Sequence, residues 1–319
     1  MINILTGDCR DVLATLPDCS VNCCVTSPPY FGLRDYGCDG QIGLESTPDT
    51  YVAELVAVFR EVKRVLRDDG TLWLNLGDSY ASTTSGTGAR GGSFAAERAQ
   101  WQGDARPVQI PPGLKPKDLI GIPWRVAFAL QADGWYLRQD IIWHKPNPMP
   151  ESVTDRCTKS HEYIFLLSKS ARYYFDNKAI MEPAQYGEQH AAKATSWGTN
   201  RKHPNKANVD DYAFKGDNHT TSKMEDGSYG RNKRSVWTVT TKPYKGAHFA
   251  TFPPDLIRPC ILTGCPQGGT VIDPFGGSGT TGEVCEEEGR NSILIELNPE
   301  YVKLAKRRTA QAGLFCTTA

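Results

Sequence analysis

The chain has 319 residues, of which 39% are hydrophobic and 23% are charged, and 36 basic side chains balance 36 acidic ones. A chain of this length can bury about 75% of the surface that it exposes when unfolded, so its core needs no disulfide or metal cross-links. No apolar run approaches the ~20 residues of a membrane span, and the N-terminus lacks the features of a secretion signal. We therefore expect a soluble cytoplasmic protein with no membrane partner, built as about two domains or as one domain with insertions.

The cysteines and histidines give no indication of a metal site. Ten cysteines are scattered along the chain, which is typical of free thiols in a reducing compartment and not of a disulfide framework. No pair has Cys-x-x-Cys spacing, and His144 and His161 lack the spacing of helical ligands. We predict that the protein holds no metal.

Apolar runs alternate with helical patterns, which favours an α/β fold with a parallel sheet. The clearest helix begins at about residue 49 and ends at about residue 67, because apolar residues from Val52 to Leu66 recur at spacings of three and four and Gly70 follows. A further helix is expected over 122–132. The predicted strands cover 21–26, 71–76, 135–143, 162–167, 270–272 and 292–295.

Two polar segments interrupt this pattern. Residues 79–117 are rich in Gly, Ser and Thr and are predicted to form a mobile insertion. Residues 182–240 contain few aliphatic side chains, and segments of that length without a core are usually functional or disordered. Near its end, residues 231–245 contain five basic side chains and no acidic one, which fits either a solvated loop or a patch that binds phosphates.

A glycine loop near the C-terminus has the pattern of a nucleoside site. A predicted strand ends at Asp273, the glycine-rich residues 276–280 open a helix, and the next strand ends at Glu296. In Rossmann-like sheets an acid about 20 residues past the loop binds ribose hydroxyls. Asp273 beside the loop would repel a pyrophosphate, so a nucleoside that carries a positive charge is favoured over a dinucleotide. No lysine follows the glycines, which disfavours a nucleotide-hydrolysing loop.

The segment Thr26–Tyr30 follows the first buried strand, at the edge where open α/β sheets bind ligands. Two consecutive prolines stiffen the turn, so the hydroxyl of Ser27 and the carbonyl of Pro28 can act as fixed acceptors. Tyr30 adds a flat aromatic face. A base whose amino group donates two hydrogen bonds while its ring stacks on Tyr30 would match these groups.

These two motifs resemble those of the DNA amino-methyltransferases, which methylate cytosine N4 or adenine N6 with S-adenosylmethionine. The order of the motifs is similar to the permuted β group, and the resemblance covers most of the chain. Three further segments take part in it: residues 6–21, residues 143–175 with His161-Glu162, and residues 248–256. The resemblance implies a Rossmann-like, S-adenosylmethionine-dependent methyltransferase sheet in circularly permuted order with an inserted target-recognition region.

The resemblance also assigns roles to domains and residues. It implies a catalytic part over 1–181, a target-recognition region over 182–240 and a cofactor-binding part over 241–319, with double-stranded DNA as the partner. The residues implied in catalysis are Ser27, Pro28, Pro29 and Tyr30. Those implied in cofactor binding are Asp8, Cys9, Phe249, Thr251, Pro253, Asp273, Pro274, Phe275, Gly276, Gly277, Ser278, Gly279, Thr280, Glu296 and Asn298. Those implied in DNA binding are Lys145, Arg231, Lys233, Arg234 and Lys242.

Several alternatives stay open. Cytosine C5 methylation would need a cysteine nucleophile, but the pattern around Cys260 is that of a core helix. A dehydrogenase would need a glycine loop early in the chain and no acid in the place of Asp273. A non-catalytic DNA-binding protein that keeps only a relic of the nucleoside site would be expected to have lost the Pro-Pro-Tyr motif, which is present here. We favour cytosine N4 over adenine N6 because serine precedes Pro-Pro-Tyr. The DNA sequence recognised, the oligomeric state and a restriction endonuclease counterpart are not encoded in any pattern of the sequence.

Overall fold

A computed structural model describes residues 1–81, 110, 113–184, 221–223, 228–241 and 252–315. The chain divides into two compact units. The first comprises Met1–Phe175 with Ser235–Ala319, and the second comprises Asp176–Arg234. Among the described residues no helix is long and apolar enough to cross a membrane.

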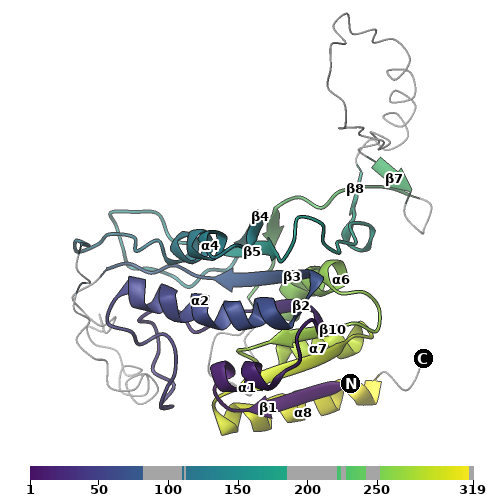
Figure 1. Cartoon of the computed structure of the whole chain (residues 1–319). Coiled ribbons are helices and arrows are strands. Elements are labelled where there is room, and N and C mark those ends of the chain that lie inside the picture. The colour runs from purple at the N-terminus through teal and green to yellow at the C-terminus, as the bar shows by residue number, and fades with distance from the viewer. Residues whose placement is uncertain (82–109, 111–112, 185–220, 224–227, 242–251, 316–319) are drawn as a thin grey trace, which may run out of the picture. The chain divides into compact units, whose positions relative to one another are not determined.

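The first unit is built on an eight-stranded sheet in the order β1-β11-β10-β2-β3-β5-β4-β9 (Figure 1). Its strands are β1 (Ile2–Thr6), β2 (Val21–Thr26), β3 (Leu66–Leu76), β4 (Tyr136–His144), β5 (His161–Ser168), β9 (Val236–Thr238), β10 (Thr270–Asp273) and β11 (Asn291–Glu296). Its helices are α1 (Cys9–Thr15), α2 (Pro48–Val65), α4 (Ile122–Ala132), α6 (Pro254–Gly264), α7 (Thr280–Glu287) and α8 (Pro299–Phe315).

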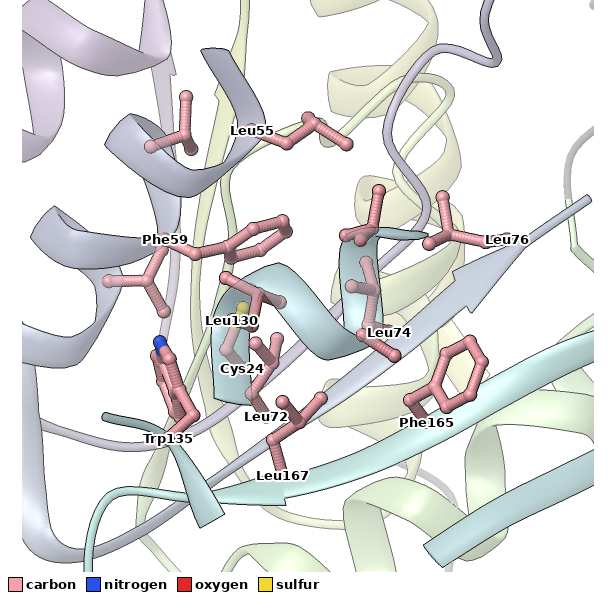
Figure 2. Packing of buried hydrophobic residues seen from close by; sticks show 14 of the residues in the cluster. Cys24, Leu55, Phe59, Leu72, Leu74, Leu76, Leu130, Trp135, Phe165 and Leu167 are labelled. Carbon is pink, nitrogen blue, oxygen red and sulfur yellow. The ribbon is translucent and has the colours of Figure 1, made fainter. Parts of the chain in front are cut away.

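Helices cover both faces of this sheet. On one face α1, α2 and α4 pack on Cys24 and on alternate residues of β3, and Figure 2 shows Leu55, Phe59 and Leu130 gathered there. On the other face α6 and α7 pack on Cys23, Val25 and Trp73. Because successive strand residues point to opposite faces, the uninterrupted apolar run of β2 fills both cores.

The sheet is mixed, which differs from the predicted parallel sheet. β5 runs antiparallel to both of its neighbours, β3 and β4, whereas all other neighbouring pairs are parallel. Antiparallel neighbours need no crossover helix, and β4 passes to β5 through residues 145–160 without one. The predicted strands 135–143 and 162–167 have no predicted helix between them, which is the one sequence signal of this reversal.

The bounds of several elements agree with the sequence prediction. The strand over Val21–Thr26 and the helix over Ile122–Ala132 are confirmed. The first long helix ends at Val65, earlier than predicted, because Leu66 already pairs with Val21 in the sheet. β3 therefore begins at Leu66 and not at Thr71, with a register shift in its partner between Val21 and Cys23.

The second unit contains a short 3-10 turn over Lys178–Ile180 and a three-stranded antiparallel sheet. Its strands, in the order β6-β8-β7, are β6 (Glu182–Pro183), β7 (Thr221–Lys223) and β8 (Tyr229–Arg231). This compact unit ends at Arg234, before the end of the predicted target-recognition region 182–240: β9 pairs with β4, and Trp237 is buried in the first unit. Most of the predicted insertion 79–117, and residues 185–220 and 224–227, lie outside the described residues.

Candidate active site

A cavity of about 800 Å³ lies where the parallel strands β1, β11, β10 and β2 end. Its walls come from segments that are far apart in sequence but whose strands are neighbours in the sheet. Those segments include residues 7–9 after β1, 27–30 after β2, 274–278 after β10 and 295–298 at the end of β11. The two predicted motifs therefore share one cavity.

Glu296 lines this cavity, and backbone amides fix its carboxylate. The N–H of Gly277 donates to Oε2 and the N–H of Asn298 donates to Oε1, each at 2.8 Å. Burial raises the pKa of Glu296, while these two amides oppose the rise. A carboxylate accepts about four hydrogen bonds, so lone pairs are left for the hydroxyls of a ligand. Asn298 also lines the cavity, and its side chain accepts from the N–H of Glu300 at the start of α8.

The glycine loop is held by close packing and by one arginine. A Cβ at Gly276 would lie 2.9 Å from Cβ of Leu294, so the loop can lie this close to β11 only with glycine. Arg308 of α8 donates to Ser278 Oγ at 3.1 Å and to Thr280 Oγ1 at 2.8 Å. The loop residues that line the cavity are Pro274, Phe275, Gly276, Gly277, Ser278 and Thr280.

Asp273 takes a different place from the one predicted. Its carboxylate is 1% exposed, does not line the cavity, and accepts from the hydroxyls of Thr26 and Thr281 at 2.6 Å each. Burial raises the pKa of Asp273 to about 6. The group thus ties β2, β10 and α7 together beneath the loop.

Two other residues predicted to bind the cofactor also lie outside the cavity wall. Gly279 is the residue before α7 and has a φ of 85°, and a Cβ there would lie 2.9 Å from Cα of Ala305. Pro253 is buried as the residue before α6. Both are therefore packing positions, whereas the neighbouring Phe252 lines the cavity. Phe249 and Thr251 lie outside the described residues.

Asp8 and Cys9 lie on the cavity wall at the start of α1. Asp8 accepts from the backbone N–H of Arg10 and from its guanidinium Nε, both at 2.9 Å, and this partner lowers the pKa of the carboxyl. Arg10 also donates to the carbonyl of Gly40 and to Glu54, each at 2.9 Å. Burial raises the pKa of the Cys9 thiol to about 12, so the thiol is neutral at pH 7.

The Ser-Pro-Pro-Tyr segment forms the opposite part of the same wall. The carbonyl of Pro29 accepts from the hydroxyl of Tyr51 at 2.8 Å. Among the described residues no hydrogen bond reaches the carbonyl of Pro28, so this oxygen can accept from a ligand, as predicted. The Tyr30 ring lies against Gly77, at the end of β3.

Three polar residues of the cavity were not predicted in catalytic roles. Glu162 and Lys145 form an ion pair beside Tyr30, and Asn75 donates to the carbonyl of Tyr163 at 3.0 Å. Glu162 lies within the family resemblance but was given no role there, and Lys145 was assigned to DNA. Asn75 is polar within an apolar strand, which is the sequence signal that could have revealed it.

Three basic residues of the predicted patch 231–245 lie at the end of the second unit, and the remainder of that range belongs to the first unit. Arg231, Lys233 and Arg234 surround the single carboxylate of Glu182 at 3.6, 3.8 and 2.9 Å. Lys242 lies outside the described residues.

Cys260 is buried in α6 and is 1% exposed, as predicted for a core position. It does not line the cavity. The structure thus offers no cysteine nucleophile at this position, which removes the main support for cytosine C5 methylation.

The fold is that of the methyltransferases that use S-adenosylmethionine, as two solved structures show. The PvuII DNA methyltransferase (cytosine-N4-specific) superimposes with a TM-score of 0.62 at 18% identity, covering 96% of this chain and 86% of that chain. The protein TTHA0409 from Thermus thermophilus, complexed with S-adenosyl-L-methionine, gives a TM-score of 0.56 at 22% identity and covers 98% of this chain and 96% of that chain. At sequence identities this low, the similarity to these two structures establishes the fold alone.

The family follows from the sequence. The profile of the DNA methylase family, whose members act on N6 or N4, matches residues 21–307. The Type II methyltransferase M.XycI of Xanthomonas campestris pv. cyanopsidis is 52% identical over 305 residues, which are 96% of this chain and 86% of that protein. The chain belongs to the DNA methylase family and is a DNA methyltransferase that uses S-adenosylmethionine. The predicted family, fold class, enzyme class and cofactor are confirmed.

Proposed function

We propose that this enzyme methylates the N4 amino group of a cytosine flipped out of double-stranded DNA, at one recognition sequence. The observation that supports this most is the single cavity of about 800 Å³ shared by Glu296, the glycine loop and the Ser27–Tyr30 segment. A nucleoside cofactor bound at one end of this cavity and a base bound at the other would lie in the same space, so a methyl group could pass directly from one to the other.

The residues of the first end fit the cofactor. Glu296 would accept from the ribose hydroxyls, and Asp8 and Cys9 would lie beside the adenine. The loop from Pro274 to Thr280 would border the remainder, with Phe252 beside it. S-adenosylmethionine, when bound, supplies a methyl group on a positively charged sulfur.

The residues of the second end would activate the base. The amino nitrogen of cytosine is a poor nucleophile because its lone pair is delocalised into the ring. Ser27 and the Pro28 carbonyl would accept its two hydrogens, and the lone pair would then point toward the methyl group. Such positioning is worth up to ~7–11 kcal/mol in ideal intramolecular cases. Serine at position 27, in place of aspartate, favours cytosine N4 over adenine N6.

The second unit would recognise the DNA sequence. Arg231, Lys233 and Arg234, which lie together around Glu182, would contact phosphates. A flipped base is required because an amino group inside a duplex cannot reach the cavity. The Type II designation of M.XycI supports a restriction endonuclease as the counterpart of this enzyme.

The test is chemical analysis of the product. Unmethylated genomic DNA is incubated with the enzyme and S-adenosylmethionine and digested to nucleosides, which are then separated and weighed. We expect N4-methyldeoxycytidine, and none with a Ser27→Ala, Tyr30→Ala double variant that still binds cofactor. N6-methyldeoxyadenosine would refute the choice of target atom, and the absence of any methylated nucleoside would refute methyl transfer.

A further inference from the structure

Glu162 connects two groups of the base end that are distant in sequence. Its Oε2 accepts from the hydroxyl of Tyr30 at 2.7 Å, and its Oε1 pairs with the ammonium of Lys145. Asn75 Oδ1 lies 3.3 Å and Ser27 Oγ lies 3.5 Å from the same Tyr30 oxygen. One carboxylate therefore fixes the aromatic face and a cation on the same wall.

The pair is mostly shielded from water. The side chains of Lys145 and Glu162 are 19% and 15% exposed, and both line the cavity. The ammonium also lies 4.3 Å from the centre of the Trp143 ring, which favours a cation. Removal of the carboxylate would leave a poorly solvated cation and would leave the Tyr30 hydroxyl with only the longer contact to Asn75 Oδ1 as an acceptor among the described residues.

Lys145 has donors to spare. An ammonium has three N–H donors, and the carboxylate of Glu162 is the one acceptor recorded for it among the described residues. Along its Watson–Crick edge cytosine presents the ring nitrogen N3 next to its amino group and then the carbonyl oxygen O2, whereas adenine presents N1 and then an apolar C–H. A cation on this wall therefore complements a pyrimidine better than it complements adenine.

We propose that Glu162 is a positioning residue for the flipped base, which holds Tyr30 in its stacking position and holds Lys145 where it donates to N3 and O2 of cytosine. This inference rests on the proposed function and deepens it, because it names groups that would select the base. It also makes the predicted DNA contact of Lys145 specific, because it assigns this residue to the flipped base.

The test compares Glu162→Ala and Glu162→Gln with Glu288→Gln, a matched control in which the carboxylate pairs with Arg258 outside the cavity. After the methylated site has been mapped, kcat and the KM for DNA are measured separately. Base flipping is followed by the fluorescence of 2-aminopurine beside the target, and cofactor affinity is measured by calorimetry. Glu162→Ala should lower kcat about 10- to 100-fold, the range for a lost hydrogen bond to a charged group. Glu162→Gln should lose less because its amide oxygen can still accept from Tyr30.

Two further variants separate positioning from other roles. In a Tyr30→Phe background, Glu162→Ala should cost less than in the wild type, because part of its effect passes through the hydroxyl. Lys145→Met should lower kcat and leave the dependence of DNA binding on salt unchanged. A phosphate contact would instead reduce the salt slope by about one and leave kcat intact.

The inference is overturned if Glu162→Ala keeps kcat within twofold of the Glu288→Gln control, if its effect is fully additive with Tyr30→Phe, or if Lys145→Met changes only the salt slope. Each of these outcomes requires a wild-type enzyme that methylates DNA. A wild type that forms no methylated nucleoside would refute the proposed function instead, so the two failures are distinguishable.

Discussion

Gly77 offers a perturbation whose size follows from the structure. A Cβ at this position would lie 2.5 Å from Cε2, 3.1 Å from Cδ2 and 3.3 Å from Cζ of Tyr30. Carbon atoms in contact lie about 3.5–4.0 Å apart, so Gly77→Ala requires a movement of about 1 Å. Gly77 directly follows β3, between β2 and β5 in the sheet, so we expect the ring and not the backbone to move.

The displaced ring should lose its hydrogen bond to Glu162 and its alignment with the base. A misplacement of about 1 Å can cost about 100-fold in rate, and we expect a loss of this size in kcat/KM for DNA. Cofactor affinity should stay within about twofold, because the groups around Glu296 do not contact the ring. The assay is transfer of a radioactive methyl group to DNA, with calorimetry for the cofactor.

The same change in a Tyr30→Ala background provides the control. Without the ring there is nothing for the added methyl to displace, so Gly77→Ala should then cost little further activity. Wild-type kcat/KM in the single variant, or an equal loss in both backgrounds, would refute the reasoning that Gly77 acts through Tyr30.

Three further predictions concern the cofactor end. Burial raises the pKa of Asp273 from 3.8 to about 6. This carboxyl therefore contributes stability that is full below about pH 4 and is lost, by about 3 kcal/mol, as the pH rises through 6. Urea unfolding at pH 4 and pH 7 should show that Asp273→Asn removes this contribution to the pH dependence of the free energy of unfolding, and an unchanged pH dependence would contradict the assignment. Arg10→Ala removes a donor from the Gly40 carbonyl and should weaken S-adenosylmethionine binding about tenfold by calorimetry, whereas unchanged affinity would show that this contact is dispensable. Arg308→Met leaves Glu283 unpaired and should lower the free energy of unfolding by about 2 kcal/mol, which a urea titration would contradict with a change below about 0.5 kcal/mol.

The elements with a strong local pattern could be predicted from the sequence. Val21–Thr26 is bounded by two prolines, and Ile122–Ala132 has a regular apolar face, so local chemistry sets their ends. The direction of β5 and the early start of β3 depend on partners elsewhere in the sheet. Leu66 becomes a strand residue because Val21 pairs with it, and no window around Leu66 contains that information.

The candidate site divides in the same way. The glycine loop, Glu296 and the Ser27–Tyr30 segment have local sequence patterns from which each could be picked out, and the structure brings all three to one cavity. The contact between Tyr30 and Glu162 spans 132 residues and has no local pattern. The position of Asp273 beside the loop is visible in the sequence, whereas the two threonine hydroxyls that donate to its carboxylate meet it only in the fold.

The central claim is that the cofactor and the target base meet in one cavity. The most direct measurement is a crystal structure of the enzyme with a non-reactive analogue of S-adenosylmethionine and a DNA duplex that contains the mapped site. We predict that the analogue ribose lies on Glu296 and that a cytosine stacks on Tyr30 with its amino group at Ser27 and Pro28. A target base that stays in the duplex, or an analogue bound away from Glu296, would contradict the account.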